Sequence, residues 1–336
     1  MRTQLKTTFD EIISPENLLE AWGEFVKGKR GKIDVQEFNR HLMDNLMQLH
    51  SDLTDGNYQH GPYQAFTISD PKRRDIHKAS VRDRVLHHAI YKQLYPFFDH
   101  TFVSDSFSCR LEKGTHEAMR RFRYMANRAS KNNTRTCWVL KCDIRKFFAS
   151  IDQGILLYIL STYILDQKIL GLLKQIVTSF QSTGLGKGLP LGNLTSQLLV
   201  NVYMNEFDQY VKHRLRAKYY IRYADDFVLM AGNKELLERA VIPVSRFLEQ
   251  CLQLSLHPDK ISIETSASGV DFLGWVHFPK HQVLRTVTKR RMQKRIQQNP
   301  EPETLASYLG LISHGDTEQL RQEALNTYAI SRAQVA

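Results

Sequence analysis

The sequence predicts an α+β fold in which a few β-strands carry helices on one face. Short apolar segments with strand-like composition alternate with longer segments whose apolar residues recur at helical spacing. Acidic residues lie at the ends of these strands. Asp143 follows one strand, and the pair Asp225–Asp226 lies between two others. The ends of strands are where such sheets present their chemistry, although the fold by itself establishes no function.

Length and charge narrow the class of protein. The chain has 336 residues, 42% of them hydrophobic, and a net charge of +11, so we expect two or three lobes that attract polyanions. Nucleic acid is the commonest such partner, and an anionic membrane surface is the rival. No apolar run reaches the roughly 18 residues of a membrane span, and the N-terminus lacks the apolar core of a signal peptide. These features predict a cytoplasmic protein without membrane contact. The four cysteines are too few and too scattered for a disulfide framework or a zinc site, and we expect them reduced and mostly buried.

The first part of the chain reads as helices followed by a hairpin. Segment Ser14–Leu49 has helical periodicity, broken at 27–32 by lysines and glycines that favour a loop. Residues Tyr63–Ser80 include strand-like alternation with a turn at Asp70–Pro71. Segment Val81–Phe98 has the spacing of an amphipathic helix.

The remainder alternates strands and helices. A strand at 137–142 leads to Asp143, and the strands at 218–223 and 227–230 form a hairpin with acidic residues at its tip. We expect a pair of strands around Ile261 and Phe272. The predicted helices cover Ile155–Phe180, Leu194–Leu215, Lys234–Leu252 and, as basic helices, about the last 50 residues.

The three aspartates point to divalent metals. Carboxylates that converge from separate elements suit Mg²⁺, which prefers oxygen ligands and is often completed by substrate phosphates. Two such ions can activate an attacking hydroxyl and stabilise a leaving pyrophosphate. The alternative for any single aspartate is ordinary turn chemistry, since Asp is common in hairpins. The sequence around them decides between the two interpretations.

Five segments resemble, in the correct order, motifs of the reverse transcriptase family. Tyr223–Asp226 matches the family's YxDD box, and the last segment resembles its primer-grip hairpin, with Phe272, Leu273 and Gly274. The five are Asp143–Asp152, Leu189–Gly192, Tyr223–Asp226, Leu254–Lys260 and Val270–Gly274. Five ordered motifs over about residues 65 to 280 are far more specific than one YxDD box alone.

The resemblance implies a right-hand polymerase fold and a division into lobes. The palm would combine an antiparallel sheet with helices, and the thumb would be small and helical. The expected regions are a helical N-terminal extension at 1–60, fingers at 61–135, a palm at 136–280 with a fingers insertion near 155–188, and a thumb at 281–336.

The resemblance also implies roles at the metals. Asp143, Ile144, Asp225 and Asp226 would lie at two Mg²⁺ ions, with Mn²⁺ as the alternative, and the three aspartates would be catalytic. Lys260 would protonate the leaving pyrophosphate, because a general acid must reach the leaving group. The alternative for Lys260 is a solvated lysine after a turn.

Nucleotide binding is expected from three segments. Phe148 occupies the position where the family places a ring beneath the incoming sugar, which would exclude a 2′-hydroxyl and select dNTPs. The alternative for Phe148 is a core aromatic, an interpretation that applies equally to neighbouring Phe147. The basic run 72–84 resembles the family's phosphate-binding segment, with Arg74 as the phosphate arginine and Lys72 as its partner. The competing interpretation is a solvated stretch that touches the template backbone.

One motif departs from the usual family pattern. In Leu189–Gln197, Leu191 replaces a glutamine and Gln197 a proline, while Gly192 is kept; all three would lie at the dNTP site. The family's glutamine contacts the incoming nucleotide, and leucine offers no polar group, so we predict an error-prone enzyme. Neutral variation with unchanged fidelity is the alternative for Leu191.

The altered motif resembles the reverse transcriptases of diversity-generating retroelements, which copy a template RNA with errors at adenines. The runs Ser106–Arg110 and Lys113–His116 resemble the same subgroup. Reverse transcriptases of antiphage defence, which make cDNA from a dedicated RNA or without template, share this block and remain the alternative. A catalytically idle RNA-binding protein is the third hypothesis, which the intact aspartates disfavour.

The C-terminal region predicts a nucleic-acid grip. Segment Leu284–Ile296 is a basic amphipathic helix, in which Lys289, Arg290 and Lys294 would meet phosphates of the duplex. A basic helix on a membrane surface is the rival interpretation. The expected partners are template RNA, an RNA/DNA duplex, dNTPs, and either a small basic accessory protein or a second copy of the chain. No RNase H-like or endonuclease motif follows the thumb, so we expect those activities to come from elsewhere.

Overall fold

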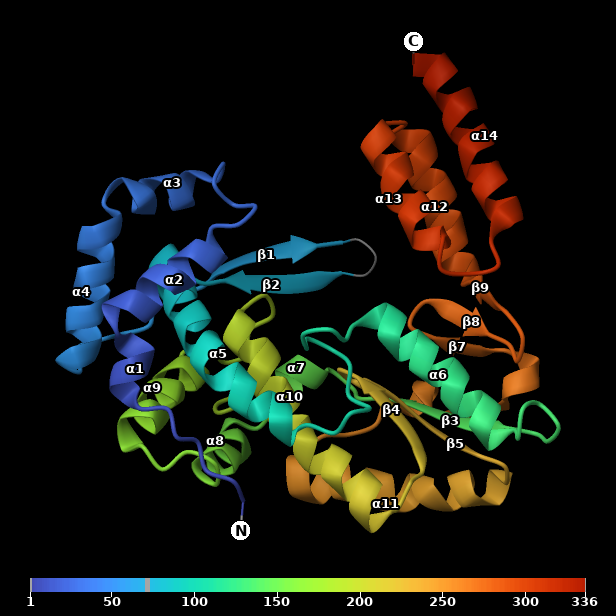
Figure 1. Ribbon diagram of the computed structural model, residues 1–336, viewed down its shortest axis with the longest axis horizontal. Coiled ribbons are helices and arrows are strands. Elements are labelled where there is room, and N and C mark those ends of the chain that lie inside the picture. Colours follow the sequence, from blue (N-terminus) through green and yellow to red (C-terminus); the bar gives the residue numbers. More distant parts are fainter. Residues whose placement is uncertain (1, 70–72, 336) are drawn as a thin grey trace.

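The computed structural model describes residues 2–69 and 73–335 and has the predicted α+β composition, with many helices around antiparallel sheets (Figure 1). Within those residues the strands form three separate sheets, of two, four and three strands. The helices at the N-terminal end lie at the left of the view and the last three helices at the upper right, and the four-stranded sheet lies at the lower right, below those last three helices (Figure 1).

The N-terminal helices begin where the sequence supplies caps. Thr8 and Glu11 form a capping box at the first helix, and Ser14 caps the second. The basic run at 27–32 forms the turns between the second and third helices, as predicted. The four helices are α1 (Phe9–Ile13), α2 (Pro15–Phe25), α3 (Ile33–Arg40) and α4 (Leu42–Thr54).

A two-stranded hairpin follows these helices. Strands β1 (Gln64–Ile68) and β2 (Arg74–Lys78) pair antiparallel and project away from the helices, and all five residues of β1 are exposed (Figure 1). The turn predicted at Asp70–Pro71 lies outside the described residues. The next helix, α5 (Val81–Thr101), begins at Ser80, whose side chain accepts from the Asp83 amide.

The root of this hairpin is fixed by a buried carboxylate on α5. Asp83 accepts hydrogen bonds from the Tyr58 hydroxyl (2.8 Å), the Ser80 hydroxyl (2.6 Å) and the Gly61 amide (3.1 Å). The chain entering β1 is therefore anchored, whereas β1 itself is exposed along its length and β2 is partly buried over its last three residues.

The four-stranded sheet has the order β4-β5-β3-β6, all antiparallel. Alternate residues face opposite sides: Val139 and Ile221 pack against α6 (Thr115–Ala129), while Leu140 and Tyr220 join the core that includes α10 and α11. Helices therefore cover both faces, and the prediction of helices on one face was wrong. The strands are β3 (Trp138–Asp143), β4 (Tyr219–Tyr223), β5 (Asp226–Ala231) and β6 (Ser262–Thr265).

The segments around Ile261 and Phe272 do not pair with each other, so this prediction was wrong. Strand β6 pairs with β3, because its apolar residues complete the four-stranded sheet. Phe272 ends β7 (Val270–Phe272), which forms a second sheet with β8 (Trp275–His277) and β9 (Gln282–Leu284). Gly269, with φ of 88°, stands between the two sheets and lets the chain change direction.

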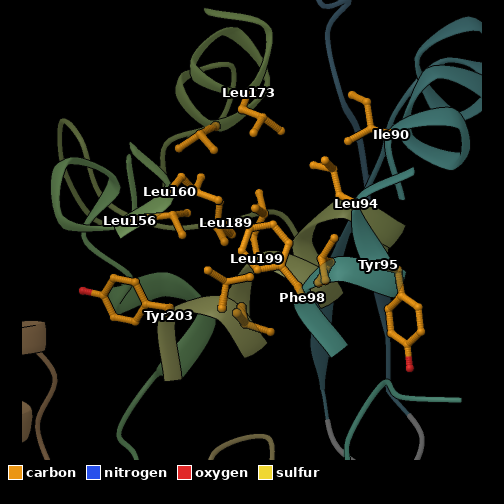
Figure 2. Close-up of a cluster of buried hydrophobic side chains, with 14 of the residues drawn as sticks. Ile90, Leu94, Tyr95, Phe98, Leu156, Leu160, Leu173, Leu189, Leu199 and Tyr203 are labelled. Atoms are coloured by element: carbon orange, nitrogen blue, oxygen red, sulfur yellow. The ribbon is translucent and has the colours of Figure 1, made fainter. Parts of the chain in front are cut away.

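The largest core lies where four helices meet (Figure 2). Leu94 and Phe98 of α5 pack with Leu160, Leu173 and other apolar residues drawn in that view, and most of these side chains are fully buried. The other helices at this core are α8 (Gln153–Ser161), α9 (Gln167–Thr178) and α10 (Leu194–Gln209). Helix α10 continues into a π-helical turn (Tyr210–Arg214), and α11 (Lys234–Leu252) covers the neighbouring part of the four-stranded sheet.

The last three helices form a bundle on the second sheet. Met292 and Ile296 of α12 (Thr286–Gln298) share a separate core with Trp275 of β8. Helices α13 (Pro302–Ile312) and α14 (Glu318–Val335) complete the bundle. Gly315 of the α13–α14 loop lies so close to Trp275 that a Cβ atom there would be 2.1 Å from the indole ring.

Among the described residues, no helix has the length and apolarity needed to cross a membrane. The cysteines are all free, as predicted. Cys137 and Cys142 are buried, but Cys109 and Cys251 are exposed, so the expectation of mostly buried thiols holds for only two of them.

Candidate active site

The three predicted aspartates meet at one end of the four-stranded sheet. Asp143 is the last residue of β3 and is the register partner of Asp226, the first residue of β5. Asp225 occupies the two-residue turn between β4 and β5, and its carbonyl accepts from the Ile144 amide at 3.2 Å. Side chains of directly paired residues point to the same face of a sheet. The hairpin with acidic residues at its tip is therefore confirmed as a structural feature.

The carboxylates at this end of the sheet repel one another. Burial, followed by the charge of Asp225, raises the pKa of Asp226 to about 6. Burial also raises the pKa of Asp225, with a further contribution from Asp143. Lys141 and Lys260 act in the opposite direction on these carboxyl groups. A site whose carboxylates repel one another suits a bound cation.

The side chains do not by themselves form a complete metal cage. Within residues 2–69 and 73–335, no group of three or more His, Cys, Asp or Glu side chains has the arrangement of a metal site. Mg²⁺ is often held by one or two carboxylates together with waters and substrate phosphates, so the donors present fit a site that the substrate completes.

Lys260 lies in this site, as the motif order predicts. It ends the 3₁₀ turn Pro258–Lys260, and its ammonium donates to Asp143 Oδ2 at 2.8 Å although the side chain is 41% exposed. The same segment is tied to β3 by the His257 amide, which donates to the Asp143 carbonyl at 2.8 Å. The lysine is therefore a neighbour of the aspartates and is at the same time an exposed residue at the end of a turn.

A cleft of about 660 Å³ lies between the β1–β2 hairpin and the start of α10. Arg74, Phe148 and Leu191 line it, three of the residues predicted at the dNTP site. The others lining it are Ala65, Phe66, Thr67, Arg73, Asp75, His77, Ala149, Phe180, Gln181, Ser182, Thr183 and Leu189. Phe147 is buried in the core at the start of α7 (Phe147–Ser150), so Phe148 is the aromatic that faces the cleft. Lys72 lies outside the described residues.

Arg74 connects this cleft to the aspartates. Its charge is one of those that lower the pKa of Asp225 against the effect of burial. A guanidinium that lines the cleft and acts on the carboxylates lies where a triphosphate would join the two. Arg73 also lines the cleft, and the sequence did not identify it.

The hairpin rests on the altered motif at 189–197. The His77 amide donates to the Leu191 carbonyl at 3.0 Å. Gly192 has φ of 106°, and a Cβ there would lie 2.9 Å from Ile76 Cγ2, so glycine is required for this close approach. Among the described residues that line the cleft, neither Gly192 nor Gln197 occurs. The side-chain amide of Asn193 is buried and has no hydrogen-bond partner among the described residues.

The predicted primer-grip segment is a tight hairpin. Leu273 and Gly274 connect β7 to β8 with φ of 53° and 86°, the left-handed conformations of a type I′ turn. Phe272 is fully buried and stacks on Phe122 of α6, with ring centroids 5.5 Å apart. Leu273 and Gly274 are only partly buried, so these two turn residues are accessible to a ligand whereas Phe272 is not.

Two of the three predicted duplex-binding cations on α12 are exposed. Arg290 and Lys294 are one helical turn apart and therefore on the same face. Lys289 instead pairs with Glu323 of α14 at 2.9 Å, which commits its charge to the bundle.

The sequence interpretation missed a buried arginine next to the aspartates. Arg222 of β4 is fully buried and pairs with the equally buried Asp208 of α10. A signal existed, because Arg222 interrupts an otherwise apolar or aromatic strand two residues before the turn. Buried charges of this kind are rare unless they are paired.

Comparison with known proteins adds to this geometry. The family model described as reverse transcriptase (RNA-dependent DNA polymerase) matches residues 69–277, which include all three aspartates. Protein YkfC of Escherichia coli is 29% identical over 320 residues, covering 82% of each chain.

Two further relatives are longer than this chain. The group II intron-encoded protein LtrA of Lactococcus lactis is 21% identical over 306 residues, which are 69% of this chain and 49% of LtrA. The putative COX1/OXI3 intron 2 protein of Saccharomyces cerevisiae is 20% identical over 279 residues, or 64% of this chain and 30% of that protein. The chain thus spans half or less of these two relatives.

Proposed function

Because the chain belongs to the reverse transcriptase family and is an RNA-directed DNA polymerase, we propose that it is an error-prone member that copies a dedicated template RNA in a diversity-generating retroelement. The observation that carries the proposal is Leu191, an apolar side chain in the wall of the cleft that Arg74 and Phe148 also line. The family's polar side chain at this position contacts the incoming nucleotide, and leucine has no donor or acceptor to replace it.

In this proposal the lobes follow the expected division. The β1–β2 hairpin belongs to the fingers, the four-stranded sheet to the palm, and α12 to α14 to the thumb, with α1 to α4 as an N-terminal extension. The N-terminal extension packs on α5, and α5 also anchors the hairpin. The extension therefore supports the fingers through α5.

Asp143, Asp225 and Asp226, with the backbone of Ile144, would hold two Mg²⁺ ions, or Mn²⁺ in their place. When bound, such ions favour the attack of the primer 3′-hydroxyl and stabilise the leaving pyrophosphate. The chain's own contribution is to fix the carboxylates on two paired strands, so that little reorganisation is needed when the nucleotide arrives.

The remaining site residues bind and select the nucleotide. Arg74 would clamp the triphosphate, with Lys72 as its partner. Phe148 would lie under the sugar and exclude a 2′-hydroxyl, because a ring in the cleft wall leaves no room for it. Lys260, already hydrogen-bonded to Asp143, would hand its proton to the leaving pyrophosphate.

The duplex would lie along the C-terminal bundle and the second sheet. Arg290 and Lys294 are exposed on one face of α12 and would contact its phosphates without reading sequence. The turn Leu273–Gly274 would support the primer end. A small basic accessory protein, or a second copy of the chain, would complete the machinery.

The proposal is tested by measuring fidelity with and without a polar group at position 191. Purified wild-type protein, Leu191→Gln and Asp225→Asn would extend a primer on an RNA template rich in adenines, and the products would be sequenced. We expect Asp225→Asn to lose incorporation, and Leu191→Gln to lower the error rate opposite adenines about tenfold, as one regained polar contact allows.

The similarity to known proteins also supports a competing interpretation. Two relatives are named as intron proteins, so an accurate polymerase of an intron-like element is the competing interpretation. If wild-type protein, supplied with its RNA and partner, copies adenines as accurately as other bases, the mutagenic proposal fails while the polymerase assignment stands.

A further inference from the structure

A completely buried ion pair lies directly beneath the catalytic turn. Arg222 of β4 donates to Asp208 of α10 through Nε (2.8 Å) and Nη2 (2.7 Å), and both side chains have no exposed surface. Removing two charges from water is energetically unfavourable, and a well-packed apolar pair would often be at least as stable. The pair therefore needs an explanation other than stability.

The guanidinium also has three further acceptors. Nη2 donates to the Ser106 hydroxyl at 3.0 Å, and both terminal nitrogens lie 3.3 Å from Asn201 Oδ1. Nη1 donates to the Ala224 carbonyl at 3.1 Å. A guanidinium has five N–H groups in a rigid plane, and these acceptors can take all of them. Its orientation is therefore fixed by the surrounding core.

The contact with Ala224 is the informative one. Ala224 has φ of 54°, a left-handed conformation that is unfavourable for any residue other than glycine and that persists only where its surroundings enforce it. Its carbonyl belongs to the planar peptide unit that leads into Asp225. The next carbonyl, that of Asp225, is held by the Ile144 amide at 3.2 Å. Both peptide units that flank Asp225 are thus fixed, one by Arg222 and one by β3.

We propose that Arg222, held by Asp208, is a positioning residue that fixes the Ala224–Asp225 peptide and thereby aims the Asp225 carboxylate at the metal site. Arg222 does not touch the substrate. It acts on the reaction through the turn, so the proposal rests on the polymerase function proposed above. A buried ion pair used in this way supplies one defined geometry rather than extra stability.

A neighbouring segment completes the support. The Phe107 amide donates to the Arg222 carbonyl, and the Arg222 amide to the Asp105 carbonyl, both at 3.0 Å. Thr115 donates to the hydroxyl of Tyr223 at 3.2 Å. Residues near 105–107 therefore lie along the edge of β4 like an additional strand. The runs at 106–110 and 113–116, singled out in the sequence, thus obtain a structural role beside the catalytic hairpin.

The test replaces the pair by apolar residues of similar size. In Arg222→Met/Asp208→Leu no unpaired charge remains, but the buried polar groups of Tyr220, Ser106 and Asn201 lose their partners, so we expect a folded protein with a lower melting temperature than wild type. The Ala224 carbonyl also loses its donor. We expect kcat to fall about a hundredfold, the effect of misplacing a reacting group by about 1 Å. The Mg²⁺ concentration for half-maximal rate should rise several-fold, while binding of primer–template in the absence of dNTP stays unchanged.

A matched control shares the network but not the turn. Tyr220 lies on the same strand and donates to the same Asp208 carboxylate at 2.6 Å, without contact to Ala224. We expect Tyr220→Phe to lower the melting temperature while kcat and the Mg²⁺ response remain within about twofold of wild type. If Tyr220→Phe reduces kcat as much as the double replacement, general loosening of the core explains the effect and the proposal is overturned.

Two further outcomes separate the possible failures. If wild-type protein polymerises and the double replacement does so equally well, with an unchanged Mg²⁺ response, the positioning role is refuted and the proposed function survives. If wild-type protein does not polymerise, the proposed function fails first. Should the double replacement not fold, Arg222→Lys keeps the charge beside Asp208 but cannot reproduce the planar fork, so the same loss of kcat at preserved fold is expected.

Discussion

Two antiparallel hairpins contribute to the active site, and the protein supports them in opposite ways. The β4–β5 hairpin, which carries Asp225 and Asp226, is buried along both strands and is paired with β3. The β1–β2 hairpin, which carries Arg74, has an exposed β1 and pairs with no further strand among the described residues. The proposed metal ligands thus lie on a well-buried element, and the arginine proposed to bind the nucleotide lies on an element with little burial to hold it.

This difference indicates a division of labour. Carboxylates that bind metals must keep their positions to within a fraction of an ångström, whereas a surface that admits a triphosphate and releases pyrophosphate gains from freedom to move. The β1–β2 hairpin is anchored near its root, by Asp83, by the contact of His77 with Leu191 and by the ion pair of Lys78 with Asp34. Four predictions test the comparison, beginning with the largest expected effect.

The strongest test concerns the rigid hairpin. Asp226→Asn removes one of the repelling carboxylates, whose pKa is raised to about 6 by burial and by Asp225. We expect a loss of polymerase rate on the order of 10³-fold together with a higher melting temperature in metal-free buffer. The exposed carboxylate of Asp259 is the control, since Asp259→Asn should change neither quantity. A lower melting temperature for Asp226→Asn would contradict the view that the site is strained electrostatically.

The second test concerns the exposed hairpin. Arg74→Ala should reduce kcat/KM for dNTP about 10- to 100-fold, the value of one or two charge-assisted hydrogen bonds, and should leave the melting temperature unchanged. Arg73→Ala is the matched comparison, because Arg73 is the neighbouring arginine that lines the same cleft. Equal losses in both variants would show that the hairpin contributes general positive charge rather than a directed contact.

The third test concerns the cleft between the hairpins. Phe148→Val opens the wall of the cleft, so discrimination against rNTPs should fall about tenfold with a smaller effect on dNTP incorporation. The control is Phe147→Leu, which alters the buried neighbour and should cost stability without changing sugar selection. Competition assays with paired dNTP and rNTP give the ratio directly.

The smallest effect is expected at the root of the exposed hairpin. Burial, then His60, lowers the pKa of His87 to about 3, while Asp83 opposes this and His88 and Arg84 reinforce it. The folded-state pKa of His87 lies below its unfolded value of about 6.5. Below about pH 6.5 the unfolded state therefore binds a proton that the folded state does not, and the free energy of unfolding decreases progressively as the pH falls toward 3.

We therefore expect the melting temperature to fall by about 5 °C between pH 7 and pH 5, and His87→Asn to reduce this dependence. Other buried histidines, such as His277, contribute to the wild-type curve, so the difference between the two proteins is the quantity to measure. Parallel curves for wild type and variant would exclude His87 as the source.

Much of the fold could be predicted because local pattern and tertiary structure agree. The β4–β5 hairpin, α5 and α11 each follow an uninterrupted periodic segment, and the structure has them at the predicted positions. Helix α6 was not predicted, because four arginines obscure its amphipathic pattern, and its apolar side is visible only once Ala118 and Phe122 are seen against the sheet. The pairing of β6 was assigned wrongly, since partner choice is a property of the sheet.

The same holds for the active site. The aspartates and Lys260 belong to short motifs whose chemistry is local, and they lie together in the structure, while Phe148 lines the neighbouring cleft with Arg74 and Leu191 as the motifs predict. Arg222 could not be identified as a support for the turn, because its partners Asp208 and Ser106 are distant in sequence. Contacts of this kind depend on the folded arrangement of three separate segments.

The close fit of Gly315 against Trp275 has a consequence for the placement of the C-terminal bundle. The indole of Trp275 belongs to the core that joins this bundle to the second sheet, and only a residue without a side chain fits at 315. A bulkier residue would displace α12, α13 and α14 together, because a closely packed core transmits a displacement instead of absorbing it. One loop glycine thus constrains the position of three helices relative to the sheet below them.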